Sequence, residues 1–193
     1  MRNAVELVVT VAVAIGLALL IQATVVKPYR IPSLSMYPTL RMGQRILVNR
    51  LDTSPALGDV VVFDAPAGAE EEICHDRAQG PGHPSPCDTE NPVESSETFV
   101  KRVVGLPGDR LRISNGHVWR NGVQERGAYV QPCRVAENCT FARTIVVPAG
   151  AYYMMGDNRG DSDDSRFWGP VPQRWIIGVA FFTYWPLSRV GTL

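Results

Sequence analysis

The sequence predicts a mainly β, antiparallel-sheet domain preceded by one N-terminal transmembrane helix. An uncharged apolar run opens the chain, short segments rich in β-branched and aromatic residues follow it, and no later stretch keeps a helical period. With 193 residues, the chain is long enough for one domain of ordinary size and an appendage. We therefore expect a tail and membrane anchor over residues 1–26 and a β-rich domain over residues 27–193.

The apolar run extends from Leu7 to Val26 and holds twenty residues without a charge. As a helix it would be about 30 Å long, which matches the hydrocarbon core of a bilayer. A cleaved signal peptide is the alternative, but the apolar core of a signal peptide usually has only about 7 to 15 residues. The run therefore predicts a retained single-pass anchor, with the lipid bilayer as a partner.

All four cysteines follow the apolar run and lie in polar contexts: Cys74, Cys87, Cys133 and Cys139. An even number of such cysteines predicts two disulfides in an oxidising compartment, so we expect the domain on the extracytoplasmic side. Sequence proximity favours Cys74 with Cys87 and Cys133 with Cys139, while the two other pairings stay open. A zinc site that adds His75 and His83 to the first pair is an alternative, although its spacing fits no standard pattern.

Eight segments have the composition of β-strands and are separated by turn signals. They are residues 45–50, 59–63, 98–105, 110–114, 117–120, 143–148, 151–156 and 175–185. Asn115-Gly116 and Asn121-Gly122 are typical of type I′ hairpin turns, in which both central residues need positive φ. These signals predict a scaffold and carry no chemistry.

The segment from Ala65 to Glu97 has a different composition. It is rich in Pro, Gly, Glu and Ser and has too few apolar residues to bury a surface of its own, so we expect an exposed excursion of the chain. The formal net charge is zero and the basic residues are scattered. Nucleic acid is therefore not expected as a partner.

Lys101 is the residue whose context first suggests chemistry, because common nucleophile motifs are absent and the three histidines lie in polar or turn segments. Strand alternation puts Lys101 on the same face as Phe99 and Val103. If that face is buried, loss of water lowers the pKa of the amine from about 10.4 to roughly 7 or 8, as a general base requires. A solvated, outward-facing lysine is the alternative.

Four blocks of the sequence resemble, in the same order, those of type I bacterial signal peptidases, a Ser-Lys dyad family of serine proteases. The blocks are IPSLSMYPTL (31–40), GDVVVF (58–63), KRVVGLPGD (101–109) and GDNRGDSDDSRFWG (156–169). The resemblance implies the family's fold and an enzyme of the bacterial cell membrane. Its reaction is cleavage of N-terminal signal peptides from exported preproteins after small residues, at Ala-x-Ala sites.

By this resemblance Ser35 is the nucleophile, Lys101 is its general base, and Ser33 joins the backbone N–H of Ser35 in the oxyanion hole. Ser162 would hydrogen-bond and orient the Lys101 amine. Four further residues would hold the loop of the site: Arg102, Asp157, Asp164 and Arg166. The prolines at 32 and 38 predict a stiff, extended segment around Ser35, whose edge pairs with substrate.

The sequence departs from the usual family pattern in two places. Gly160 and Asp161 stand where an Asp-Asn pair is usual, and Leu34 stands between the serines where Gly is frequent. The first departure concerns loop support, the second the space for substrate, and neither removes a member of the dyad. The acidic block also fits a calcium loop poorly, so we expect neither a metal nor another cofactor.

The resemblance also implies a shallow apolar pocket that accepts small substrate residues. Its walls match Tyr29, Ile31, Pro32, Met36, Leu40, Phe99 and Val100. The partners would be preprotein signal peptides and the secretion translocon. Four aromatic residues either enter the bilayer interface or belong to the core: Trp175, Phe181, Phe182 and Trp185. Two alternatives stay open, a related pilus or self-processing peptidase and an inactive extracytoplasmic binding domain.

Overall fold

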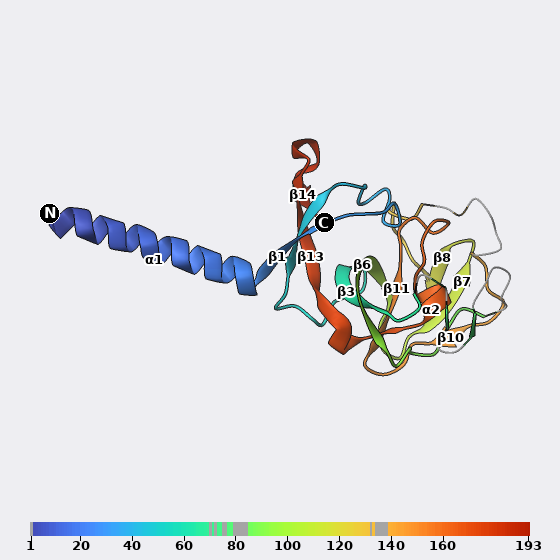
Figure 1. The fold of residues 1–193 in the computed structure, drawn as a ribbon. Helices are drawn as coiled ribbons and strands as arrows, with labels where there is room; N and C mark the ends of the chain where they lie inside the picture. The colour runs from blue at the N-terminus through green and yellow to red at the C-terminus, as the bar shows by residue number, and fades with distance from the viewer. Residues whose placement is uncertain are drawn as a thin grey trace.

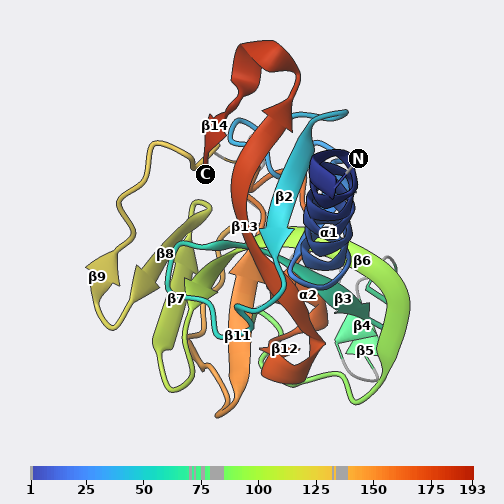
Figure 2. The ribbon, with the colours of Figure 1, turned by 90° about the vertical axis from the view of Figure 1, so that its left-hand side faces the viewer.

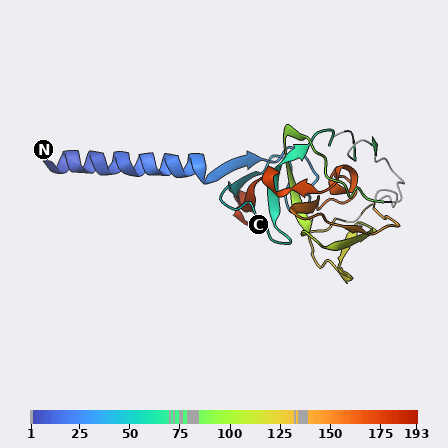
Figure 3. The same ribbon diagram turned by 90° about the horizontal axis from the view of Figure 1, so that it is seen from below.

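A computed structural model describes residues 2–69, 71, 73–74, 77–78, 85–131, 133 and 139–193 of the chain. The first element is helix α1 (Arg2–Thr24), which extends away from a β-rich domain (Figure 1). Seen from below, α1 leads directly into the first strand (Figure 3). Within the described residues, no helix combines the length and hydropathy that a membrane span requires.

The large sheet of the domain is antiparallel and has the strand order β1-β2-β13-β3-β6-β11-β12, with β14 paired to β13. Figure 2 shows β2 beside β13 in this sheet. Its strands are β1 (Val26–Arg30), β2 (Arg45–Asn49), β3 (Val60–Pro66), β6 (Glu94–Gly105), β11 (Ala151–Met155), β12 (Val171–Pro172), β13 (Ile176–Trp185) and β14 (Gly191–Thr192). The predicted mainly β, antiparallel architecture is confirmed.

A small sheet packs beside the large one and has the order β10-β7-β8-β9. Its strands are β7 (Arg110–Ser114), β8 (His117–Arg120), β9 (Val123–Gln124) and β10 (Ile145–Val146), and a separate pair is formed by β4 (Ile73–Cys74) and β5 (Arg77–Ala78). Both predicted hairpin turns are confirmed, because Asn115 and Asn121 have φ of 50° and 52° and each is followed by a glycine of positive φ.

β3 separates two apolar cores, since successive residues of a strand face opposite sides. Val61 and Phe63 pack in the cluster that contains Trp168, and Val62 packs in the cluster that contains Met36. A fully buried apolar side chain of this size contributes roughly 1.5 to 3 kcal/mol to stability. The segment that carries Ser35 is thus attached to the domain by its own apolar side chains.

The predicted exposed excursion over residues 65–97 is corrected at its start, where the chain is buried, whereas residues 94–97 are mostly exposed but belong to strand β6. Pro66 pairs with Glu94 in the register of β3 and β6, and Ala65 and Ala69 are buried in the core. Backbone pairing needs no apolar side chains, and two alanines add little to the apolar content of a segment, so a polar composition did not reveal either feature. The middle of the excursion lies partly outside the described residues.

Two predictions about local structure are also corrected. Residues 33–40 form consecutive turns and not an extended segment, with hydrogen bonds from Tyr37 N to Leu34 O (2.9 Å) and from Leu40 N to Met36 O (2.8 Å). A short helix, α2 (Ser165–Trp168), lies where no helix was expected, because the Asp164 side chain caps it by accepting a hydrogen bond from Arg166 N.

Both disulfides favoured by sequence proximity are confirmed: Cys74 with Cys87 and Cys133 with Cys139. The thiolates of the first pair are therefore not available for zinc, and the histidines of that alternative, His75 and His83, lie outside the described residues.

Candidate active site

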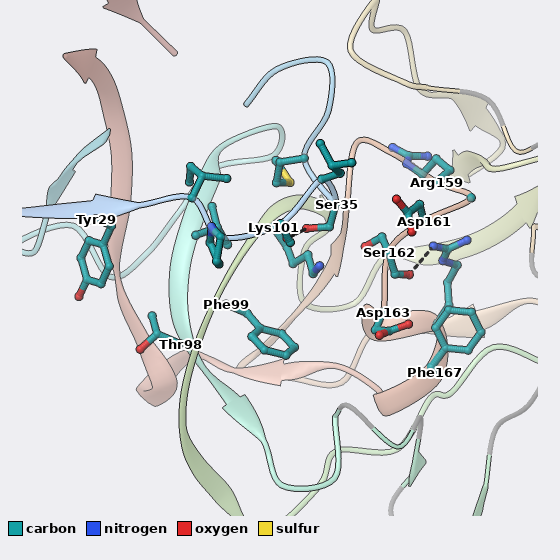
Figure 4. Close-up of a pocket in the computed structure, with 18 of the residues that line it drawn as sticks. Tyr29, Ser35, Thr98, Phe99, Lys101, Arg159, Asp161, Ser162, Asp163 and Phe167 are labelled. Atoms are coloured by element: carbon teal, nitrogen blue, oxygen red, sulfur yellow. Dashed lines mark hydrogen bonds between the residues drawn. The ribbon is translucent and has the colours of Figure 1, made fainter. Parts of the chain in front are cut away.

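A cavity of about 760 Å³ opens where three distant parts of the chain meet (Figure 4). They are the end of β1 with the turns that follow it (29–36), the middle of β6 (98–101), and the loop before and within α2 (159–163 and 166–167). Both Ser35 and Lys101 line it. The sheet topology explains why these parts meet. β1 is an edge strand, and residues 98–101 of β6 pair with β3 on one side only, because β11 pairs with β6 from Arg102 onward. The other edge of residues 98–101 therefore faces the cavity.

Ser35 is held in place by the loop of the fourth sequence block. Asn158 N donates a hydrogen bond to the Ser35 carbonyl oxygen (3.0 Å), and Asn158 Nδ2 donates to the carbonyl oxygen of Leu34 (3.2 Å). The hydroxyls of Ser33 and Ser35 are 3.2 Å apart. The nucleophile expected from the sequence and its expected oxyanion partner therefore lie side by side at the mouth of the cavity.

Lys101 lies on β6 opposite Val61 and is 5% exposed. Burial lowers the pKa of its amine to about 8, although Asp164, Asp163 and Asp161 oppose the shift. Nζ lies 5.5 Å from the centre of the Phe99 ring and points into the same part of the cavity as the Ser35 hydroxyl (Figure 4). The solvated alternative for this lysine is therefore wrong.

Two hydrogen bonds of the Lys101 amine, one with Ser35 and one with Ser162, are not formed within the described residues. Lys101 and Ser35 share none, and the buried Ser162 hydroxyl has no hydrogen-bond partner, so the expected bond from Ser162 to Lys101 is missing. The Ser162 backbone is nevertheless fixed, because Arg166 Nη2 donates to its carbonyl oxygen at 3.0 Å. The Ser162 hydroxyl thus lies at the cavity with its hydrogen-bonding capacity unused.

Gly156 permits the close approach of the loop to Ser35. A Cβ at this position would collide with the Ser162 hydroxyl and with the backbone carbonyl oxygen of Ser35. Gly156 N also donates to Asp164 Oδ2 at 3.0 Å. Only a residue without a side chain fits between these groups.

Two buried ion pairs support the loop, as expected from the sequence. Arg102 binds Asp157 at 2.7 and 2.6 Å, and Arg166 binds Asp164 at 2.8 and 2.9 Å. Burial alone would raise the pKa of Asp164, but the charge and hydrogen bonds of Arg166, together with Lys101, lower it below its usual value. Asp164 is therefore a stable anion and has the character of a support, not of a proton donor.

Arg159 is a functional candidate that the sequence did not reveal. Its side chain is fully buried and donates hydrogen bonds to the carbonyl oxygens of Gly156 and Gly116 and to both oxygens of Glu125. An arginine within an acidic block was the available signal, but its partner Glu125 lies outside every block. Arg159 ties the small sheet to the loop that holds Ser35.

Most of the expected pocket walls line the cavity: Tyr29, Ile31, Pro32, Met36, Phe99 and Val100. Leu40 does not, because the turn that begins at Met36 carries it into the core, where it is fully buried. Leu34, between the serines, lines the cavity and is 46% exposed. The four aromatic residues that were expected either at the bilayer interface or in the core do not share one environment. Trp175 belongs to the core, whereas Phe181 and Trp185 are exposed.

The chain is similar to known proteins over most of its length. A family model described as signal peptidase, peptidase S26 matches residues 4–185. The chain is 37% identical to a probable signal peptidase I-1 of Synechocystis sp., covering 94% of this chain and 82% of that one. It is 33% identical to a signal peptidase I of Leptolyngbya laminosa, covering 95% and 81%. A signal peptidase I structure from Enterococcus faecalis V583 is 26% identical, and the match covers 65% of this chain and 96% of that one with a TM-score of 0.39.

Proposed function

Because the chain belongs to the signal peptidase, peptidase S26, family, we propose that it is a membrane-anchored enzyme that cleaves signal peptides with Ser35 as nucleophile and Lys101 as general base. The observation that carries the proposal is the buried Lys101 amine, whose pKa is lowered to about 8, in the same cavity as the Ser35 hydroxyl. An amine that is partly neutral at physiological pH can accept a proton, which an exposed lysine at its ordinary pKa rarely does.

In the first step the neutral Lys101 amine takes the hydroxyl proton of Ser35, while Ser35 Oγ bonds to the carbonyl carbon of the scissile peptide. The resulting oxyanion accepts hydrogen bonds from the Ser33 hydroxyl and the Ser35 N–H, a type of contact worth about 3 to 4 kcal/mol in the transition state. The C–N bond then breaks, and the Lys101 ammonium gives its proton to the leaving amine. An acyl ester on Ser35 remains.

In the second step a water molecule gives a proton to Lys101 and its oxygen bonds to the ester carbon. The C–O bond to Ser35 breaks, Ser35 recovers a proton from Lys101, and the signal peptide leaves with a new carboxyl terminus. Catalytic hydrogen bonds are often long or misaligned without substrate. We therefore propose that substrate closes the gap between Lys101 and Ser35, and that the unused Ser162 hydroxyl then orients the amine.

The substrate would bind as an extended strand between the free edge of β1 and residues 98–101 of β6. Backbone pairing of this kind gives affinity without regard to side chains, and the pocket then supplies selectivity. Ile31, Phe99 and Leu34 narrow the cavity with apolar surface. A wall of this kind rejects large side chains by overlap, which supports cleavage after small residues at Ala-x-Ala sites.

Membrane anchoring through α1 is part of the proposal. It is supported by the uncharged run from Leu7 to Val26 and by the exposed apolar side chains of α1, of which Leu7 and Val8 are 65% and 66% exposed. The two disulfides support an extracytoplasmic domain, near the translocon that delivers preproteins. Confining enzyme and substrate to one surface raises their effective concentration. Exposed Phe181 and Trp185 are suited to contact headgroups.

The test is a cleavage assay on a preprotein with an Ala-x-Ala site. Ser35→Ala and Lys101→Met should each abolish cleavage while the thermal transition is retained, which also separates an active peptidase from an inactive binding domain of the same fold. Ser54→Ala is the matched control, because the Ser54 hydroxyl is exposed and its partner is Gln173, away from the cavity. Near wild-type turnover by the Ser35 or the Lys101 variant would overturn the dyad.

A further inference from the structure

Arg189 lies at the end of the short helix η3 (Leu187–Arg189), in the hairpin that projects from the domain and joins β13 to β14 (Figures 1 and 2). Its Nη2 donates hydrogen bonds to the carbonyl oxygens of Pro38 (3.3 Å) and Thr39 (3.0 Å). These carbonyls belong to the same set of turns as Ser35. A residue close to the C-terminus thus contacts the segment that carries the proposed nucleophile.

The same segment is held from its other side by the fourth block. Thr39 Oγ1 donates to Asp157, Arg102 binds both of these residues, and Asn158 N binds the Ser35 carbonyl. Asn158 therefore binds the turns at Ser35 and Asp157 binds them at Thr39. Arg189 is a second partner at the Pro38–Thr39 end. Without Arg189 this end would depend on the Thr39 hydroxyl alone for its polar contacts to side chains among the described residues.

The hairpin itself does not need Arg189 to close. Backbone pairing joins Phe182 to Thr192, and Leu193 N donates to Phe181 O at 3.1 Å. Its neighbours are exposed, with Leu187 at 77% and Val190 at 47%. The hairpin's own structure thus does not require the guanidinium. Both of its hydrogen bonds go to residues 33–40, the nucleophile segment, outside the hairpin.

We propose that Arg189 is a positioning residue for the peptidase reaction, which fixes the turns that aim Ser35 Oγ at the scissile carbonyl. The inference rests on the proposed role of Ser35. Hydrogen bonds from Tyr37 N to Leu34 O and from Leu40 N to Met36 O run through the segment, so displacement of Pro38 and Thr39 is passed on to Ser35. A misplacement of about 1 Å at a reacting atom can lower the rate on the order of 100-fold.

The test is a kinetic comparison of full-length variants. R189M keeps the apolar stem but removes the donors, and should lower kcat on the order of 10- to 100-fold while KM changes little, since the pocket walls are untouched. R189K keeps the charge and some donors and should give an intermediate kcat. R174M is the matched control, because Arg174 lies in η2 (Gln173–Trp175) at the other end of β13 and stacks on Trp175 (5.3 Å). R174M should keep the wild-type kcat.

Chemical rescue separates positioning from a purely structural role. Guanidinium ion, added at non-denaturing concentration, should restore part of the kcat of R189A and leave the wild type and R174M unchanged. The proposal is overturned if R189M keeps kcat within twofold of wild type, if no guanidinium rescue is seen, or if R189A and R189M fail to fold. If Ser35→Ala is inactive while R189M is fully active, only this inference fails; an active Ser35→Ala defeats the proposed function itself.

Discussion

Glu125 and Arg159 form a two-pronged ion pair that joins the small sheet to the loop of the active site. Arg159 Nη2 donates to Glu125 Oε2 at 2.8 Å, Nη1 donates to Oε1, and the Arg159 side chain is fully buried. Glu125 also accepts a hydrogen bond from Val118 N at 2.7 Å. Because Arg159 follows Asn158, which binds the Ser35 carbonyl, the pair links the small sheet to the nucleophile segment.

Glu125→Ala should destabilise the protein and lower activity. The substitution leaves the Arg159 guanidinium buried without a carboxylate, which typically costs about 3 to 5 kcal/mol in the free energy of unfolding. Urea denaturation and kcat/KM below the transition measure the two effects. Arg120→Ala is the control, since the Arg120 side chain is 37% exposed and its partner Asp109, which is 10% exposed, keeps its hydrogen bonds from Leu106 N and Asn121 Nδ2, so the loss should be about 1 kcal/mol. Equal effects of the two variants would contradict the role of the buried pair.

The rate should increase with pH through the pKa of Lys101. Burial lowers that pKa to about 8, and only the neutral amine accepts the Ser35 proton, so kcat/KM should be low at acid pH, rise near pH 8 and then level off. Measurement of kcat/KM between about pH 6 and 9.5 tests this expectation. A profile that is flat across this range would rule out Lys101 as the base.

Lys101→Met should stabilise the fold at neutral pH even though it removes activity. The folded-state pKa of about 8 lies below the ordinary lysine value of 10.5, so the unfolded chain binds the extra proton and charging Lys101 opposes folding. This penalty is full below pH 8, decreases as the pH rises and vanishes above about 10.5. At about 1.4 kcal/mol for each pH unit between the two values, the gain at pH 7 is on the order of 3 kcal/mol. Urea unfolding at pH 7 and pH 10 measures it, and equal gains at both would contradict the account.

Gly156→Ala should lower kcat/KM strongly, although it adds only one methyl group. The added Cβ collides with the Ser35 backbone and the Ser162 hydroxyl, so the loop and the nucleophile segment must move apart. We expect kcat/KM to decrease by about 100-fold, in keeping with a displacement of about 1 Å at the nucleophile. Gly191→Ala is the control, because its Cβ would meet nothing within 4 Å. Wild-type kcat/KM in the Gly156 variant would show that the segment tolerates displacement.

The sequence predicted those strands that carry a local signal of their own. Val60 to Phe63 are apolar and buried, and the positive φ of Asn115 and Asn121 follows from their Asn-Gly turns. β1 escaped prediction because the sequence VKPYR has no alternating pattern, and the edge position of the strand leaves most of it exposed. A strand held mainly by backbone pairing to β2 leaves little trace in side-chain composition.

The two residues of the proposed dyad were predicted from sequence blocks, but the residues that support them were predicted only in part. Arg102 and Asp157 lie in two different blocks, and the resemblance was enough to pair them. Glu125 and Arg189 lie in no block, and Arg189 contacts a residue 150 positions away, so no local pattern could assign them. Leu40 was predicted to line the pocket because the sequence suggested an extended chain at this point. The turn that begins at Met36 places Leu40 in the core instead.

The junction between α1 and β1 has a further consequence. Only Val25 separates the helix, which ends at Thr24, from the strand, which begins at Val26 and whose last two residues, Tyr29 and Arg30, already line the cavity. Five strand residues span on the order of 17 Å. β geometry therefore sets the distance from the end of the helix to the start of the segment that carries Ser35, so that lengthening this strand should change how far from the helix end a peptide bond must lie to be cut.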